Sequence, residues 1–287
     1  MSSKRFLESI VAKKIFVFVR YSVLTKKNAS SFVIGRNIDF ETYRNELFSV
    51  ERMAVHSFLF KNLMLESIKN QSLYNADYEF KLFVLTSKEL PSEWDEDLLD
   101  ATSSFDWANV VYLSANDDVE SVVKNQVKKS VSSGDCYATV RLDDDDAISN
   151  DFFSSLSCYL YDSFDGFVVS HGLGCEALFD SSSGKLNGFR KLYYPKVSAG
   201  LAKISMVDKG KSIPSSIYGV GNHTKVDLKC RTIVDSRSLS FIRSSYGLQD
   251  TSGEGYASRL KKDVKKSNSI DAEDVLKYFS LSKVIGF

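Results

Sequence analysis

Short apolar runs alternate with amphipathic helical patterns through the first 170 residues of this 287-residue chain. Five runs have the length and composition of buried strands. They are residues 15–19, 80–85, 110–113, 137–142 and 167–170. From the second run onward, the starts lie about 30 residues apart, which is the size of a strand–helix–strand unit. This alternation predicts an α/β fold with a mostly parallel sheet and helices on both faces.

The segments between these runs carry helical spacing, and the pattern changes after Ser170. The predicted helices cover residues 47–71, 93–101, 117–131 and 152–161. Ala177–Asp180 and Leu186–Tyr194 flank a Ser-Ser-Ser-Gly turn, which is typical of a hairpin. We therefore expect one domain, with a parallel half at about 12–170. A mixed, partly antiparallel half at about 171–287 is expected on the same sheet.

Composition excludes several classes of protein. Thirty-seven basic and 37 acidic side chains give zero net charge, which argues against a protein that coats nucleic acid. No apolar run approaches the roughly 18 residues of a membrane span. The four cysteines have no Cys-x-x-Cys spacing, and residues 1–10 lack the apolar core of a secretory signal. These features predict reduced thiols and a cytoplasmic location.

Four adjacent aspartates, Asp143–Asp146, directly follow the fourth apolar run. Ligands of open α/β sheets bind at the carboxyl ends of the strands. Carboxylate oxygens at that edge suit a hard divalent cation, Mn²⁺ or Mg²⁺, whose shell substrate phosphates and water usually complete. In an extended backbone Asp143 and Asp145 share one side and Asp144 points away. The cluster predicts a metal-bridged diphosphate, although Asp-rich stretches also occur as solvated turns.

The run 139–148, Thr-Val-Arg-Leu-Asp-Asp-Asp-Asp-Ala-Ile, resembles the putative rhamnosyltransferase family, which has the glycosyltransferase A (GT-A) fold. Three further features match that family in order. They are Arg-Tyr-Ser-Val-Leu at 20–24, the pairs Leu-Phe, Arg-Met and Leu-Phe within 47–60, and Ser-x-x-Leu-Pro at 87–91. The resemblance covers residues 15–170 well and the remainder weakly. It implies a single GT-A-like domain over residues 1–287.

The resemblance assigns roles to individual residues. Asp145 would be the main metal ligand, and Asp143 would contact the metal or the ribose. Arg20, Tyr21 and Ser87, at the ends of the first two strands, would lie beside the nucleobase. The residues it assigns to the nucleotide as a whole are Arg20, Tyr21, Ser87, Arg141, Asp143, Asp144 and Lys225.

The three histidines differ in what they predict. His56 lies on an apolar helix and is expected to be a packed or surface residue. His171 follows the fifth strand, where it could also take part in acceptor binding. His223 lies in a Gly-x-Gly-Asn-His-Thr-Lys stretch, and in many transferases of this fold a late histidine completes the metal or diphosphate site. We assign His223 to the metal and Lys225 to phosphate on that resemblance.

An inverting sugar transfer needs a base to deprotonate the acceptor hydroxyl. The candidates are Glu176, Asp180, Asp250 and Glu254, of which Asp250 and Glu254 lie in a glycine-rich stretch and are our assignment. Residues 259–266 hold five basic side chains and one acid. That pattern is typical of a solvated helix face. It also suits attraction to an anionic membrane at the inner face of the plasma membrane, where lipid-linked acceptors reside.

The sequence thus predicts a metal-dependent glycosyltransferase. It would move a sugar from a nucleoside diphosphate donor to a saccharide or lipid-linked saccharide acceptor, in cell-surface polysaccharide biosynthesis. A sugar nucleotidyltransferase is one alternative, but it would need a glycine-rich loop after the first strand, and residues 20–27 contain no glycine. An Asp-x-Asp phosphohydrolase would carry the motif on its first strand. A non-catalytic saccharide- or calcium-binding module is the remaining alternative.

Overall fold

A seven-stranded sheet forms the centre of the computed structural model, which describes residues 12–26, 38–71, 77–208, 210, 212–246 and 268–286. The strand order is β10-β6-β9-β4-β1-β2-β3. The strands are β1 (Lys13–Tyr21), β2 (Tyr78–Ser87), β3 (Ala108–Leu113), β4 (Cys136–Asp143), β6 (Val168–His171), β9 (Leu201–Met206) and β10 (Thr232–Asp235). Only β9 runs antiparallel to its neighbours in this sheet, β4 and β6. The predicted mostly parallel sheet is confirmed.

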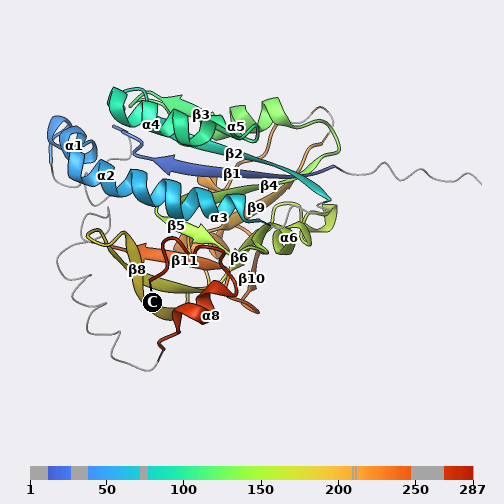
Figure 1. Ribbon diagram of the computed structural model, residues 1–287. Coiled ribbons are helices and arrows are strands. Elements are labelled where there is room, and N and C mark those ends of the chain that lie inside the picture. Colours follow the sequence, from blue (N-terminus) through green and yellow to red (C-terminus); the bar gives the residue numbers. More distant parts are fainter. Residues whose placement is uncertain are drawn as a thin grey trace, which may run out of the picture.

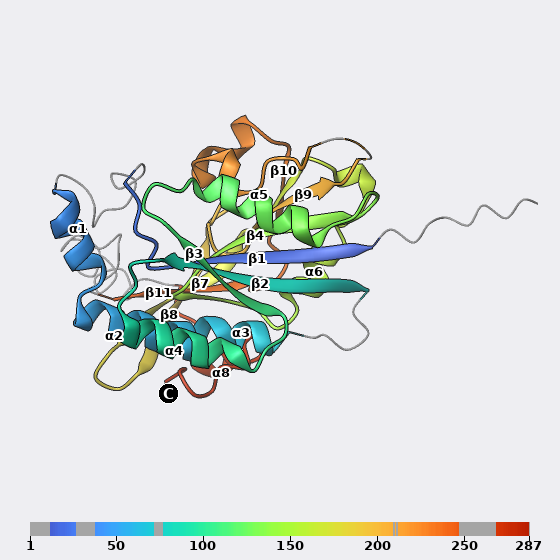
Figure 2. The same cartoon turned by 90° about the horizontal axis from the view of Figure 1, so that it is seen from above.

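Helices cover both faces of this sheet. The α-helices described up to residue 157 are α1 (Phe40–Leu47), α2 (Val50–Leu59), α3 (Leu65–Lys69), α4 (Ser92–Ser103), α5 (Val119–Ser130) and α6 (Phe152–Ser157). Seen from above, α5 lies on one face, and α2, α3 and α4 lie on the other (Figure 2). Strand β1 is buried on both sides because Phe16 and Phe18 pack toward α5, while Val17 and Val19 pack in the opposite core. A continuous apolar run is the sequence expected for such a strand.

The helix predicted over residues 47–71 is divided in the structure. Helix α1 ends at Leu47, and Ser49 adopts an extended conformation before α2 begins. A π-helical turn, η3 (Phe60–Met64), then joins α2 to α3. This joined helix crosses the front of the molecule between two sheets (Figure 1). It adds Met53 to the core of the central sheet and Leu63 to the core of the second sheet.

The second sheet has four strands in the order β5-β11-β7-β8. They are β5 (Asp146–Ile148), β7 (Leu173–Asp180), β8 (Lys185–Tyr193) and β11 (Phe241–Ser245). The predicted hairpin is confirmed as β7 and β8, but its placement on the central sheet was wrong. The chain leaves the central sheet at the end of β4, and β5 pairs antiparallel with β11 instead. At Gly174 of β7, an added Cβ would lie 2.5 Å from Phe241, so glycine permits this close packing of β7 on β11.

The remaining short elements surround the two sheets. They are η4 (Asp162–Phe164), η5 (Tyr218–Val220), η6 (His223–Leu228) and α8 (Ala272–Leu276). Helix α6 ends at Ser157, four residues before the predicted end. Among the described residues, no helix combines the length and the apolar character needed to cross a membrane.

Candidate functional site

Arg20, Arg141 and Asp143 form an ion-pair cluster at the carboxyl edge of the central sheet. Arg20 on β1 and Asp143 on β4 are neighbours in the strand register, and Arg20 Nη2 donates to Asp143 Oδ1 at 3.0 Å. Arg141 Nη2 lies 3.4 Å from Asp143 Oδ2. Ser198 Oγ donates to the same oxygen at 3.3 Å. The backbone turn after Ser198 depends on Gly200, whose φ of +75° is a conformation that favours glycine.

The charge state of Asp143 follows from this cluster. Burial alone would raise the pKa of Asp143, but the positive charges of Arg141 and Arg20 and the hydrogen bond from Arg20 outweigh it. The pKa of Asp143 therefore lies well below its usual range, and the carboxylate is ionised at neutral pH. The ring of Tyr218 lies 5.9 Å from the Arg141 guanidinium, and its hydroxyl donates to the Phe18 carbonyl at 3.0 Å. Tyr218 thus supports Arg141 from the side of η5.

The four aspartates alternate between exposed and buried positions. Asp143 and Asp145 are partly exposed, whereas Asp144 and Asp146 are buried. The expectation that Asp143 and Asp145 share a side assumed an extended backbone, and it stays a prediction because residues 144–145 form a turn between β4 and β5. Burial, together with the charge of Asp145, raises the pKa of Asp146 well above its usual value. Arg243, its partner in the register of β11, opposes that rise.

Asp144 and Asp145 are linked by two residues from distant parts of the chain. His56 Nδ1 on α2 lies 2.9 Å from Asp144 Oδ2. His56 Nε2 lies 3.0 Å from the hydroxyl of Tyr246, and that hydroxyl donates to Asp145 Oδ2 at 3.1 Å. Asp144 therefore holds His56 beneath the exposed edge. Sequence reasoning missed this role of His56, and it did not single out Tyr246.

His223 is oriented by a backbone carbonyl near the start of η6. Its Nδ1 lies 2.6 Å from the Lys196 carbonyl oxygen, which can only accept, so Nδ1 carries the proton. In a neutral ring the lone pair is then on Nε2, an arrangement typical of metal-binding histidines. Burial lowers the pKa of His223 and favours the neutral ring, and the charges of Arg141 and Asp143 also act on it. The ring of His223 also meets Tyr194 edge-on, with 6.0 Å between ring centres.

Tyr21, Ser87 and Lys225, which were also assigned to the nucleotide, have other surroundings. Tyr21 is buried in the core, where its ring meets Phe60 edge-on at 5.2 Å. Ser87 is also buried, and its hydroxyl accepts from the Glu89 backbone N–H at 3.0 Å in the turn after β2. Lys225 is exposed on η6. The structure gives none of these three side chains a contact with Arg20, Arg141 or Asp143.

The residue after Tyr21 is held in a rare backbone conformation. Ser22 has a φ of +48°, which costs energy for a residue with a side chain. The buried Arg52 donates from Nη1 to the Ser22 hydroxyl and to the Leu47 carbonyl, both at 2.9 Å. These bonds fix the chain directly after Arg20, at the edge that carries the site.

Two of the four candidate bases have structural partners. Glu176 is buried in an ion pair with Arg190 at 2.7 Å. Asp180 accepts from Ser182 and Ser183 in the β7–β8 turn. Asp250 and Glu254, which we assigned as the base, lie outside the described residues, as does the basic stretch 259–266.

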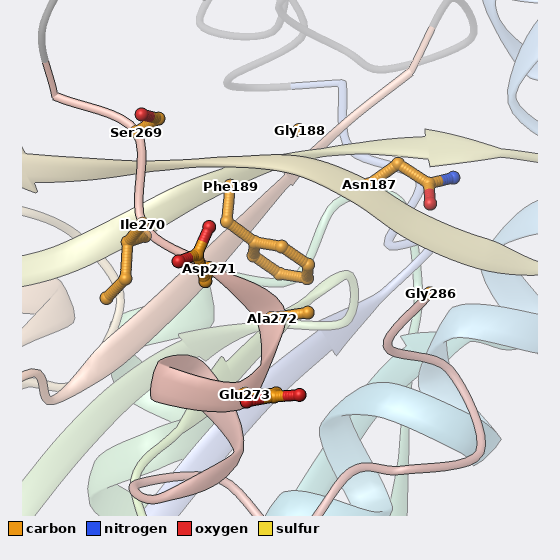
Figure 3. Close-up of a pocket in the computed structure, with 9 residues that line it drawn as sticks. All are labelled: Asn187, Gly188, Phe189, Ser269, Ile270, Asp271, Ala272, Glu273 and Gly286. Carbon is orange, nitrogen blue, oxygen red and sulfur yellow. The ribbon is translucent and has the colours of Figure 1, made fainter.

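The described residues contain no group of three or more histidine, cysteine, aspartate or glutamate side chains arranged to hold a metal ion. A cavity of about 510 Å³ lies elsewhere, at the edge of β8 beside the C-terminal segment (Figure 3). It is lined by Asn187, Gly188, Phe189, Ser269, Ile270, Asp271, Ala272, Glu273 and Gly286. None of the predicted site residues lines this cavity.

His171, at the end of β6, is buried and contacts residues of α6. Its Nε2 lies 3.1 Å from Ser155 Oγ, and its ring packs on Phe152 with 4.7 Å between ring centres. Nδ1 has no hydrogen-bond partner among the described residues. Burial lowers the pKa of His171 to about 4, against the opposing charges of Asp235 and Asp151.

This lowered pKa predicts a loss of stability in acid. The unfolded histidine titrates near pH 6.5, so below that pH the unfolded state binds a proton that the folded state does not. The free energy of unfolding should fall between pH 6.5 and 4, by about 2 kcal/mol at pH 5. Urea unfolding at pH 7 and pH 5 measures this loss. In the variant His171→Gln, whose side chain cannot titrate, the free energy of unfolding should fall less between pH 7 and pH 5. Equal losses in both proteins would contradict the prediction.

Comparison with known proteins gives one family and several distant structures. A family model described as putative rhamnosyl transferase matches residues 14–257. The search of curated proteins found no match. Three solved structures to which the chain is similar are TarS residues 1–349 from S. aureus, a Pyrobaculum calidifontis mannosyltransferase in complex with GDP-Man and Mn²⁺, and an inositol-1-phosphate CTP transferase from T. maritima.

These structural matches are distant in sequence. Identities are 12%, 8% and 12%, with TM-scores of 0.38, 0.41 and 0.34 in the same order. Coverage of this chain is 92%, 92% and 91%, and coverage of the other chains is 66%, 68% and 99%. This chain thus spans slightly less than two thirds of the TarS chain. The predicted α/β fold class rests on the chain's own topology, a mostly parallel central sheet with helices on both faces.

Proposed function

We propose that this chain, which belongs to the putative rhamnosyl transferase family, transfers a sugar from a nucleoside diphosphate donor to a saccharide acceptor with the help of a divalent cation. The observation that carries the proposal is the ion-pair cluster of Arg20, Arg141 and Asp143 beside Asp145, at the carboxyl edge of the sheet. Ligands of open α/β sheets bind at that edge. A cluster with two guanidiniums and exposed carboxylates suits a diphosphate together with a cation.

The residues present fit a hard cation by their donor chemistry. Mg²⁺ and Mn²⁺ are commonly held by one or two carboxylates, while substrate phosphates and water complete the shell. Asp145 would bind the cation directly, Asp143 is the second carboxylate on the same side, and His223 would offer Nε2. The described residues hold no ready-made group of three such ligands, so a bound donor's diphosphate and water would have to complete the shell. A bound cation would stabilise negative charge on the departing diphosphate.

The remaining site residues act by position and charge. Arg141 and Arg20 donate to Asp143 and present guanidiniums at the edge where the diphosphate would lie. Their charges would stabilise the leaving group as the glycosidic bond breaks. Tyr218 and Ser198 keep this cluster in place, which limits the reorganisation needed during reaction. The acceptor hydroxyl would lose its proton to Asp250 or Glu254.

The family description makes a rhamnosyl nucleotide the first donor to test, and other nucleoside diphosphate hexoses follow. For acceptors we propose a growing cell-surface saccharide, free or linked to a lipid at the inner face of the plasma membrane. The basic stretch 259–266 would attract the enzyme to that surface. Activity on acceptors in anionic vesicles, compared with neutral vesicles, tests this location.

Removing the metal is expected to abolish turnover of the donor. Slow hydrolysis of a panel of nucleoside diphosphate sugars, followed by nucleotide release, should occur with added Mn²⁺, stop with EDTA and return with excess Mn²⁺. The donor that reacts names the sugar. Hydrolysis that continues in EDTA would overturn the metal requirement. Binding of Ca²⁺ without any nucleotide sugar would instead favour a non-catalytic module.

A further inference from the structure

We propose that His56 and Tyr246 are positioning residues that hold Asp145 in the orientation needed for a cation. This role rests on the function proposed above. The two side chains join Asp144 and Asp145 in one hydrogen-bonded row, with contacts of 2.9, 3.0 and 3.1 Å. The row spans three separate elements, namely α2, the β4–β5 turn and the residue after β11.

The direction of the hydrogen bonds shows which residue is held by which. A tyrosine hydroxyl has one proton, and here it is donated to Asp145 Oδ2. The hydroxyl oxygen therefore accepts from Nε2–H of His56. On the other side of the ring, Nδ1 lies within hydrogen-bond distance of Asp144 Oδ2, at 2.9 Å. Asp144 thus anchors His56, His56 orients Tyr246, and Tyr246 orients the Asp145 carboxylate.

Burial makes this row rigid. Asp144 and His56 are 6% and 3% exposed, so water does not compete for their contact. The Tyr246 ring is packed between His56 at 5.8 Å and Phe179 at 6.2 Å, measured between ring centres. Only Asp145 at the end of the row is partly exposed. A rigid, buried support below one exposed carboxylate is the arrangement by which proteins orient metal ligands.

The need for such a support follows from the position of Asp145. It lies in the turn between β4 and β5, outside both strands. A carboxylate in a turn can rotate, and the ionised Asp143 nearby would repel it in some of its orientations. The Tyr246 hydroxyl opposes that rotation. Loss of a group that orients a metal ligand typically weakens metal binding about 10- to 100-fold.

Tyr246→Phe is the sharpest test, because it removes the hydroxyl and keeps the packed ring. Binding of Mn²⁺ alone to the full chain, followed by the electron paramagnetic resonance signal of free Mn²⁺, should be about tenfold weaker in Tyr246→Phe than in the unaltered protein. His56→Asn, which can still reach Asp144 but not Tyr246, should weaken binding in the same direction. Tyr137→Phe is the matched control, since Tyr137 is also buried but lies at the opposite end of β4.

The outcomes separate this proposal from the function on which it rests. Unchanged Mn²⁺ affinity in Tyr246→Phe, with hydrolysis of a nucleotide sugar still dependent on Mn²⁺, would overturn the positioning role and leave the function standing. A similar loss in Tyr137→Phe would also overturn it, because the effect would then be general destabilisation. An unaltered protein that binds neither Mn²⁺ nor any nucleotide sugar would overturn both.

Discussion

Replacing Asp145 with alanine is expected to lower the rate of sugar transfer by at least about a thousandfold. A cation that stabilises charge on a leaving diphosphate is worth several kilocalories per mole, and about 4 kcal/mol corresponds to a factor of 1,000. Asp145 is the exposed carboxylate that Tyr246 orients, so no neighbouring carboxylate has the same support. The measurements are kcat with saturating Mn²⁺ and the affinity of the variant for Mn²⁺.

Two further variants make this result specific. Asp145→Asn keeps an oxygen that can accept from Tyr246 but removes the charge, so it should lose activity nearly as fully. Asp106→Ala, at an exposed position after α4, should retain activity and Mn²⁺ binding. If Asp145→Ala keeps full activity and full metal affinity, the assignment of the cation to this cluster is wrong.

The parts of the site that the sequence predicted are those set by strand order and strand ends. The apolar run before Asp143 placed this residue at the carboxyl end of the fourth strand, and the family resemblance placed Arg20 at the end of the first strand. The alternation of side chains along an extended strand predicted that Asp143 and Asp145 share a side. The strand ends and the alternation follow from local pattern and general rules of α/β sheets, whereas the role of Arg20 came from the family resemblance. They needed no knowledge of the loops or of the second sheet.

The parts that were missed depend on packing between distant segments. His56 lies 88 residues from Asp144 and 190 residues from Tyr246, and nothing in its apolar surroundings predicts a polar partner. Its contact arises because helix α2 lies between the two sheets. Strand β5 was hidden within the acidic run, since aspartate is rare in strands and Asp146 becomes a strand residue only through pairing with β11.

Asp143→Asn is expected to separate two roles that the sequence left open for this residue, metal ligand and organiser of phosphate-binding arginines. The structure joins Asp143 to Arg20 and Arg141, and their charges hold its pKa well below the usual range. A neutral amide would leave the two guanidiniums to repel each other. Hydrogen bonds to charged groups contribute about 1.5–3 kcal/mol each. The affinity of the protein for its nucleoside diphosphate sugar should therefore fall about 10- to 100-fold.

The comparison of two binding constants decides between these roles. If Asp143 chiefly organises the arginines, Asp143→Asn should weaken binding of a nucleoside diphosphate strongly and binding of Mn²⁺ alone only slightly. The reverse pattern would make Asp143 a primary metal ligand. Asp235→Asn is the matched control, because Asp235 is also paired with an arginine, Arg237, and lies three strands from β4 at the edge of the sheet. Asp235→Asn should leave the affinities for the nucleoside diphosphate and for Mn²⁺ unchanged. A lower affinity in this control would mean that breaking any such ion pair disturbs the fold.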